Sequence, residues 1–425
     1  MTKMKRILWV QFAPFGVAGE ILGMKGNGVS GGWISTEYEN LDKNEFSVAF
    51  LCCSAAIKSI IHKKTEKGEA WCIPAPKITY GKDYSPKYED VINPIIEEAR
   101  PDIIHIWGTE TFLPAVVAAL TPDIPKVLYV QGLLGMHERY VGGYINGVDK
   151  KYYRHSNILQ RFLSKIRDYY FRKQVDLEKR IIKQTGNIIT DNQFTRAYCN
   201  SVSEKCSFYS HALMPSAAFK KAEEWNFAKV ERHSVFALYS LYPEKGLHQL
   251  LKAILIVKKA IPDVKVYIPG PYHIINHKID GKKLLPYEMW LKTYIDNNDL
   301  ADNIFFIGSQ NADGMIEHFQ KAHVFINTSC MEVHSSTLRE AMIVGTPSIS
   351  TLCGSVGEFL THGRNGLLYR YEEPEVLAWE IISLFSDDDL AKKMSKNARL
   401  TMSTFEEQVN SIPLGDIYTT IIKEV

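Results

Sequence analysis

The sequence predicts an α/β protein made of two doubly wound, Rossmann-like domains. Short, β-rich apolar runs alternate with helical patterns along the whole chain, and both halves show the same rhythm. The runs are continuously apolar, which is typical of strands covered on both faces of a parallel sheet. At 425 residues the chain is also too long for one ordinary core, so two domains are expected.

Composition favours a globular protein with a large core, because 45% of the residues are hydrophobic and 23% are charged. The formal net charge of +2 provides no global field for nucleic acid, so no nucleic-acid partner is expected. The seven cysteines form no CxxC pair and no zinc spacing, which is typical of reduced thiols and predicts a cytoplasmic location. The apolar start is interrupted by Gln11 and reads as a buried strand rather than a signal peptide.

The elements follow in order. Strands are predicted in the first half at 6–12, 46–53, 102–108, 126–132 and 187–192, with helices at 32–43 and 87–99. Strands are predicted in the second half at 234–240, 264–270, 303–309, 323–329 and 346–352. We therefore expect domains at 1–215 and 216–402, and a helical segment at 403–425 that either caps the second domain or crosses back to the first. Since ligands bind at the carboxyl ends of parallel strands, two facing domains would enclose a cleft.

A glycine-rich stretch, "GNGVSGGW", contains Gly26-x-Gly28-x-x-Gly31, the spacing of a dinucleotide-binding loop. However, the first predicted strand ends near Phe12, well before the glycines, and the second ends without a carboxylate for a ribose. A nicotinamide or flavin is therefore not expected. Gly31 and Gly32 precede a helix whose free amides can meet an anion, although the glycines can equally serve only to permit a turn.

The segment "CMEVHSSTLREAMIVGTPSIS" follows a predicted strand with Glu332, a polar turn and a helix carrying Glu340. Ser335, Ser336 and Thr337 lie where the first unpaired amides of that helix point toward the cleft, an arrangement suited to a phosphate. The alternative is structural, because Thr337-x-x-Glu340 also fits a capping box.

Two further loops end at the same edge of this predicted sheet. Lys245 opens a helix after one strand, and "TLCGSVGEF" follows another. A lysine, helix-start amides and carboxylates would thus converge on one place. That combination suits a nucleotide diphosphate that carries a polyhydroxylated group.

Together, these residues resemble the retaining glycosyltransferases of family four, which have two facing Rossmann-like domains (GT-B architecture). The resemblance runs from about Ser234 to Ala398, through "YPEKGLHQLLKA", "IFFIG", Glu332-x7-Glu340, "AMIVGTP" and "GSVGEFLTHGRNGLLY". The first half is similar more loosely, through the Gly31-Gly32 loop, "PDIIHIWGTE" and "VLYVQGL".

The resemblance implies a role for each matched residue. Lys245 would bind the donor diphosphate, the amides of residues 335–337 its distal phosphate, and Glu340 the ribose hydroxyls. Glu332 would act next to the anomeric carbon of the transferred sugar, and the Gly31-Gly32 loop would close over the phosphates. The acceptor side would lie in the first domain, where the candidate contacts are His105, Glu110, Gln131, His137 and Arg139.

The sequence departs from the family at two positions. Ser240 stands where the family usually has an arginine, so that contact is missing or comes from Arg139, Arg196 or Arg364. Gln131 stands where the family often has a histidine that faces the sugar. His105 and His137 lie near enough in sequence to replace it, although a lone histidine is more often structural.

No cofactor and no metal are expected. Fixed positive charge and amide dipoles can stabilise the leaving diphosphate, a term that is commonly the largest in such reactions. No Asp-x-Asp follows a predicted strand, and Asp387 to Asp389 read as a solvated turn and helix cap. Retention of anomeric configuration is implied by the resemblance alone.

The segment 150–183 is basic, with aromatic and aliphatic residues at near-helical spacing. It predicts either an interfacial helix, peripheral on the cytoplasmic membrane face, or an ordinary amphipathic helix that packs inward.

The sequence therefore predicts a transferase of polysaccharide biosynthesis. It would move a sugar from a nucleotide-sugar donor to a carbohydrate or lipid-linked glycan acceptor. The alternatives are an epimerase or phosphorylase of the same fold, or an inactive sugar-nucleotide-binding protein, which Ser240 and Gln131 would fit.

Overall fold

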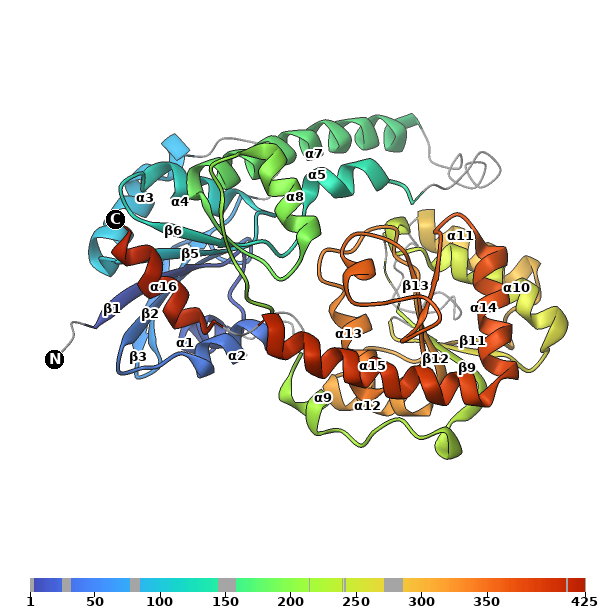
Figure 1. The fold of residues 1–425 in the computed structure, drawn as a ribbon. Coiled ribbons are helices and arrows are strands. Elements are labelled where there is room, and N and C mark those ends of the chain that lie inside the picture. The colour runs from blue at the N-terminus through green and yellow to red at the C-terminus, as the bar shows by residue number, and fades with distance from the viewer. Residues whose placement is uncertain are drawn as a thin grey trace. The chain divides into compact units, whose positions relative to one another are not determined.

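The computed structural model describes residues 4–24, 32–76, 85–143, 158–213, 215–238, 240, 242–270, 286–409 and 412–424 (Figure 1). The chain divides into two compact units. The first contains Met1–Glu138, Ser164–Met214 and Glu407–Val425, and the second contains Arg139–Leu163 and Pro215–Glu406.

The first unit is built on an eight-stranded sheet with the order β3-β4-β2-β1-β5-β6-β7-β8. Only the β3–β4 pair is antiparallel. The strands are β1 (Lys5–Val10), β2 (Phe46–Ser54), β3 (Ile61–Thr65), β4 (Gly68–Pro74), β5 (Ile103–Trp107), β6 (Lys126–Tyr129), β7 (Asn187–Ile189) and β8 (Ser207–Tyr209). The helices are α1 (Gly16–Leu22), α2 (Gly32–Asn40), α3 (Ser85–Ala99), α4 (Phe112–Leu120), α5 (Leu134–His137), α7 (Ile158–Thr185), α8 (Gln193–Val202) and α16 (Leu414–Lys423).

The C-terminal helix α16 packs on the first sheet, which begins with the N-terminal strand β1 (Figure 1). Leu414, Ile417 and Ile421 join the core of the first unit. The Tyr418 hydroxyl bonds to Trp9 Nε1 on β1 at 3.1 Å and to a ring nitrogen of His105 on β5 at 2.5 Å. An element from the end of the chain thus completes the core beneath β1 and β5.

The second unit contains a six-stranded, all-parallel sheet with the order β11-β10-β9-β12-β13-β14. The strands are β9 (Glu231–Ala237), β10 (Lys265–Ile268), β11 (Ile304–Phe306), β12 (Ala322–Asn327), β13 (Ser348–Thr351) and β14 (Leu367–Tyr369). The helices are α9 (Ala217–Lys221), α10 (Leu247–Ala260), α11 (Pro286–Asn297), α12 (Ala312–Lys321), α13 (Ser336–Val344), α14 (Pro374–Ser386) and α15 (Asp388–Val409).

Helices cover this second sheet in two groups. Helices α9, α12 and α13 pack against one another, and α10 packs against α11 and α14. Every residue of β13 is buried, as are five of the six residues of β12. This explains why these strands read as continuous apolar runs rather than as alternating ones.

The observed division differs from the predicted one at one place within the first half. Residues 139–163 were predicted to belong to the first domain, but they cluster with the second unit. Contacts near Gly142 and Gly143 account for this. Gly142 N donates to Glu244 Oε1 at 3.3 Å, and the Tyr371 hydroxyl donates to Gly143 O at 3.0 Å.

The predicted strands are present, and several end earlier than their apolar runs. The run 126–132, for example, contains β6 over Lys126–Tyr129. The three residues that follow leave the sheet and form part of a loop at its carboxyl edge. The β3–β4 hairpin was missed, because β3 is a largely exposed edge strand whose sequence, IHKKT, lacks an apolar pattern.

Candidate active site

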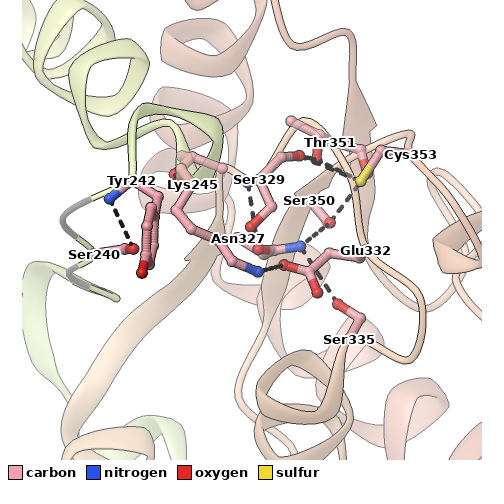
Figure 2. A network of polar contacts seen from close by, with 11 residues as sticks. Ser240, Tyr242, Lys245, Asn327, Ser329, Glu332, Ser335, Ser350, Thr351 and Cys353 are labelled. Carbon is pink, nitrogen blue, oxygen red and sulfur yellow. Dashed lines mark hydrogen bonds and ion pairs between the residues drawn. The ribbon is translucent and has the colours of Figure 1, made fainter. Parts of the chain in front are cut away.

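The second sheet brings three strand ends together. β12 lies between β9 and β13, so the loops that follow these strands meet at one edge. The loop after β9 carries Lys245, the loop after β12 carries Glu332, and the loop after β13 carries Cys353 and Gly354. Figure 2 shows this convergence, which the sequence predicted for Lys245 and Glu332.

Lys245 and Glu332 form an ion pair, with Nζ and Oε1 separated by 2.6 Å (Figure 2). The Lys245 side chain is 39% exposed and that of Glu332 is 15% exposed. Burial acts to lower the pKa of Lys245, but the charge and hydrogen bond of Glu332 outweigh it and raise that pKa above its ordinary value. The lysine is therefore a permanent cation in the neutral range.

Lys245 is held by a short, well-defined turn. Pro243 opens the 3-10 turn Pro243–Lys245, and Gly246 ends it in a left-handed conformation with φ of 73°. The Thr328 hydroxyl donates to Lys245 O at 2.7 Å and so joins this turn to the loop after β12. A Cβ on Gly246 would overlap Thr328 O, so the close approach of the two loops requires glycine.

The loop that carries Glu332 is fixed in the same way from its other side. Ser355 N donates to Glu332 O at 3.1 Å, and Ser355 Oγ donates to Val333 O at 2.5 Å. Gly354 has a φ of 50°, and a Cβ there would overlap Glu332 O. The backbone around Glu332 is thus set by contacts from both neighbouring strand ends.

Polar side chains connect these loops beneath the ion pair (Figure 2). Asn327 Nδ2, at the end of β12, donates to Ser350 Oγ on β13 at 3.0 Å and reaches Ser335 Oγ at 3.5 Å. The Cys353 thiol donates to Ser329 O at 3.2 Å, and burial raises its pKa to about 12. This thiol is therefore a neutral structural group at physiological pH.

Helix α13 begins beside Glu332, and its start is strained. Its N-cap, Ser335, has φ of 49° and ψ of 48°, the left-handed region that non-glycine residues rarely adopt, and its side chain makes no capping bond to the helix. Ser336 and Thr337 form the first turn, where amides are left without helical partners. The capping-box alternative is wrong, because Thr337 lies inside the helix and is not its N-cap.

Glu340 lies one turn further along α13. Burial alone raises the pKa of its carboxyl to about 7. A carboxylate in this environment gains from any ligand that donates hydrogen bonds to it, as ribose hydroxyls do.

Ser240 occupies the position at which the family usually has arginine, and its hydroxyl accepts a hydrogen bond from Tyr242 N at 3.1 Å. The proposed substitutes differ in position. Arg364 precedes β14 and so lies at the opposite, amino edge of the sheet, which corrects its assignment. Arg196 belongs to the first unit and donates to Ser210 Oγ at 2.7 Å, whereas Arg139 is exposed and clusters with the second unit.

Three of the five candidate acceptor residues lie at the carboxyl edge of the first sheet, whereas Arg139 clusters with the second unit and His105 lies in the core. Glu110 follows β5, Gln131 follows β6, and His137 ends the short helix α5. His105 lies inside β5, is 0% exposed and stacks on Trp107 at a centroid distance of 3.9 Å. Burial, with a smaller effect of His211, holds its pKa well below the ordinary value. His105 is therefore a neutral core residue, and its assignment to an acceptor contact is corrected.

The glycine-rich stretch falls mostly outside the described residues. Gly31 is not among them, and Gly32 is the first residue of α2.

The basic segment 150–183 is described from residue 158, as part of α7, and its side chains are described from residue 169. Val175, Leu177 and Ile181 are buried, which favours the inward-packing alternative for this half of the segment. Among the described helices, none combines the length and the apolar character needed to cross a bilayer.

One group in the described part of the chain offers three ligand atoms to a metal, namely His62, Glu69 and Glu98, with these atoms within 4.8 Å of one another. Glu69 is the second residue of β4 and Glu98 the last but one of α3, so the group lies at the amino edge of the first sheet.

The aspartates between α14 and α15 have structural partners. Asp387 accepts a hydrogen bond from Leu390 N at 2.9 Å, and Asp388 pairs with Arg232 at 2.7 Å. As predicted, these aspartates form a helix cap and an exposed turn.

Sequence reasoning missed Asn327, Ser350 and Cys353, which support the loops, and Glu178, a fully buried carboxylate on α7. A polar residue in an otherwise apolar run was the available signal for Asn327 and Ser350. Glu178 was harder to identify, because it stands in a helix with many charged residues, and the sequence does not show which of them face the core.

Comparisons with known proteins agree with this fold. The model of the family "Glycosyl transferases group 1" matches residues 220–401, which lie in the second unit. The chain is 28% identical over 188 residues to a putative glycosyltransferase, YtcC, of Bacillus subtilis, a match that covers 44% of each protein. It is 28% identical over 152 residues to N-acetyl-alpha-D-glucosaminyl L-malate synthase of Bacillus anthracis, covering 35% of this chain and 39% of that enzyme. These matches span less than half the length of either relative.

Solved structures resemble the whole chain. Sucrose-phosphate synthase from Thermosynechococcus elongatus superposes with a TM-score of 0.69 at 15% identity, covering 99% of this chain and 100% of that one. Anabaena Alr3699/HepE, solved in complex with UDP-glucose, gives a TM-score of 0.61 at 14% identity and covers 99% of both chains. The predicted fold class and the resemblance stated from the motifs are confirmed: the chain has the GT-B fold, and its residues 220–401 match the model of the glycosyl transferases group 1.

Proposed function

We propose that the protein is a retaining, metal-independent glycosyltransferase that moves a sugar from a nucleotide-diphosphate-sugar to a hydroxyl of a carbohydrate or lipid-linked acceptor. The observation that carries the proposal is the Lys245–Glu332 pair at the start of α13. It combines a permanent cation, unpaired amides and a carboxylate within one loop cluster. The match of residues 220–401 to the family model and the UDP-glucose bound by Alr3699/HepE support a nucleotide-sugar donor.

In this proposal, charge on the leaving diphosphate is stabilised by fixed groups. As the bond between the anomeric carbon and the diphosphate breaks, negative charge grows on the phosphate oxygens. Lys245 and the first amides of α13, at Ser336 and Thr337, would offset that charge, and so supply the stabilisation that a metal provides in other enzymes. Glu332 would lie against the electron-poor sugar, and Glu340 would accept hydrogen bonds from the ribose.

The first test is nucleotide binding by the purified protein. Its thermal stability is measured with UDP, GDP, ADP and their glucose conjugates, with and without EDTA. A ligand at 100 times its Kd stabilises a protein by about 2.7 kcal/mol, which gives a clear rise in Tm. The expected result is a rise with one nucleotide that persists in EDTA and is lost in Lys245→Ala.

The second sheet offers a matched control for Lys245. Lys265 pairs with Glu231 at 2.7 Å, and both residues open strands at the amino edge of the same sheet. Lys265→Ala should therefore keep the nucleotide effect. Equal loss in both variants, or no rise with any nucleotide in the wild type, would contradict the proposed donor site.

A second assay separates the alternatives. A transferase releases nucleotide from its sugar donor with acceptor or, slowly, with water, whereas an epimerase interconverts the donor without releasing it. A protein that only binds nucleotide sugars does neither. Nucleotide release that Glu332→Gln abolishes would support transfer.

A further inference from the structure

Buried polar atoms without partners gather at the carboxyl edge of the first sheet. Gln11 follows β1, Glu110 and Thr111 follow β5, and Gln131 follows β6. Both side-chain polar atoms of Gln11, Glu110 Oε2, Thr111 Oγ1 and Gln131 Nε2 are buried and have no hydrogen-bond partner within the described protein. Because buried polar atoms are nearly always paired, such a concentration on three adjacent strands indicates that partners other than the described residues complete this edge, and a bound ligand could supply them.

Glu110 extends from β5 toward β6, and two glycines leave room for it. A Cβ on Gly132 would lie 2.9 Å from Glu110 Oε1, and a Cβ on Gly108 would overlap Glu110 Oε2. The carboxyl therefore lies beside the backbone that carries Gln131, the residue before Gly132. An unpaired acceptor and an unpaired donor thus stand at the ends of neighbouring strands.

Glu178 on α7 fixes the backbone around this corner. It is completely buried and accepts hydrogen bonds from Thr109 Oγ1 at 3.0 Å, from Leu134 N at 2.7 Å, and from Gly135 N at 3.0 Å. The hydroxyl of Tyr198 on α8 donates to it at 2.6 Å. One carboxylate thus ties together the segments that follow β5 and β6.

The charge at this corner is acidic. Burial raises the pKa of Glu110 to about 7, and the neighbouring charge of Glu178 adds to the effect. The pKa of Glu178 is itself raised by burial, against the hydrogen bond of Tyr198. A phosphate or carboxylate placed here would meet two acids, whereas a hydroxyl can donate to Glu110 and accept from Gln131.

We propose that Gln11, Glu110, Thr111 and Gln131 bind the hydroxyls of an uncharged acceptor sugar, with one hydroxyl shared by Glu110 and Gln131, and that Glu178 is a positioning residue. The inference rests on the proposed function, since it assigns an acceptor class to the first unit. It names the chemistry of the acceptor, a neutral pyranose with free hydroxyls, and it predicts weaker binding of an anionic group at this place.

The test uses full-length protein saturated with UDP. Its probes are methyl glycosides of glucose, galactose and mannose and the matching 6-phosphates, observed by saturation-transfer NMR. At least one methyl glycoside should bind, and its 6-phosphate should bind more weakly. Glu110→Gln and Thr111→Val should each weaken the glycoside, about tenfold for the charged group. Binding of no glycoside, preference for a 6-phosphate, or unchanged affinity in both variants would overturn the inference.

Thr185 provides a matched control for Thr111. Its hydroxyl is also buried and unpaired, but it ends α7 just before β7, at the amino edge of the sheet. Thr185→Val should leave glycoside binding unchanged. An equal loss in Thr185→Val and Thr111→Val would indicate general destabilisation and overturn the assignment.

The role of Glu178 has its own readout, the pH dependence of glycoside affinity. Glycoside affinity should rise with pH as Glu110 loses its proton and becomes a better acceptor. Removing the charge of Glu178 in Glu178→Gln should lower the pKa of Glu110, so this rise should occur at lower pH. Tyr198→Phe, which weakens ionisation of Glu178, should cause a smaller shift in the same direction and serves if Glu178→Gln does not fold. An unchanged pH profile in both would overturn the positioning role.

Failure of this inference can be told apart from failure of the proposed function. If UDP stabilises the wild type but no glycoside binds, the acceptor assignment fails and the donor site stands. If UDP does not bind at all, the proposed function fails. If Glu110→Gln weakens UDP-glucose relative to UDP and leaves methyl glycosides unaffected, the hydroxyls are those of the donor sugar, and the acceptor assignment is overturned.

Discussion

Lys245 Nζ and Glu332 Oε1 lie 2.6 Å apart, so the cation proposed for the diphosphate is also the partner of the carboxylate proposed for the sugar. In the proposed function, a bound diphosphate would therefore compete with Glu332 for the lysine. Release of Glu332 toward the sugar would follow from donor binding.

The ion pair predicts that Glu332→Gln has opposite effects on UDP binding and on the rate of sugar transfer. Glu332→Gln frees Lys245 from its counter-charge, so UDP should bind as tightly as in the wild type or a few-fold more tightly. Sugar transfer should fall by about a hundredfold or more, because the group beside the reacting carbon has lost its charge. Calorimetry with UDP and a nucleotide-release assay measure the two effects. Unchanged transfer would remove Glu332 from the reaction, and Glu231→Gln, at the amino edge, is the control.

Gly354 predicts a severe effect of a small substitution. A Cβ at this position overlaps Glu332 O, so Gly354→Ala should displace the loop that carries Glu332 and abolish transfer. Gly363 is the control, because its φ of 74° is equally unfavourable for alanine but no heavy atom lies within 4 Å of the added Cβ. Gly363→Ala should cost about 1 kcal/mol of stability and leave transfer intact. Similar activity in the two variants would contradict this account.

The left-handed backbone of Ser335 predicts that a glycine at this position stabilises the folded protein. Its left-handed backbone costs a non-glycine residue about 1 kcal/mol, so Ser335→Gly should raise the free energy of unfolding by a comparable amount. Ser336→Gly, one residue into the helix, should lower it instead. Urea unfolding monitored by circular dichroism compares the two. If both lower stability equally, the strain assigned to Ser335 is absent.

Glu340 predicts a stability that depends on pH. Its folded-state pKa of about 7 lies above the ordinary value of 4.5, so the folded protein binds the proton more tightly than the unfolded chain. The resulting cost is absent below the unfolded pKa and complete above the folded one, where it reaches at most about 3 kcal/mol. Glu340→Gln should therefore stabilise the protein at about pH 8 and much less at about pH 5. The same variant should bind nucleotide more weakly, and equal stabilisation at both pH values would contradict the prediction.

Much of the fold could be predicted because strands buried on both faces leave a local signal. The runs at 46–53 and 323–329 contain β2 and β12 almost entirely. The Glu332 loop could also be predicted, since spacing along one segment fixes which residues surround a helix start. The left-handed backbone of Ser335 could not, because it results from the way that helix meets the strands beside it.

The sequence by itself determined the alternation of strands and helices, the presence of two largely parallel sheets, and the placement of Lys245 and Glu332 at strand ends. These depend on patterns within short segments. Only the tertiary structure decided that His105 is a core residue bonded to Tyr418, 313 positions away, and that Gln11, Glu110 and Gln131 share one edge with unpaired polar atoms. The physical reason is that burial and hydrogen bonding are settled by neighbours in space, and in a doubly wound sheet those neighbours come from distant parts of the chain.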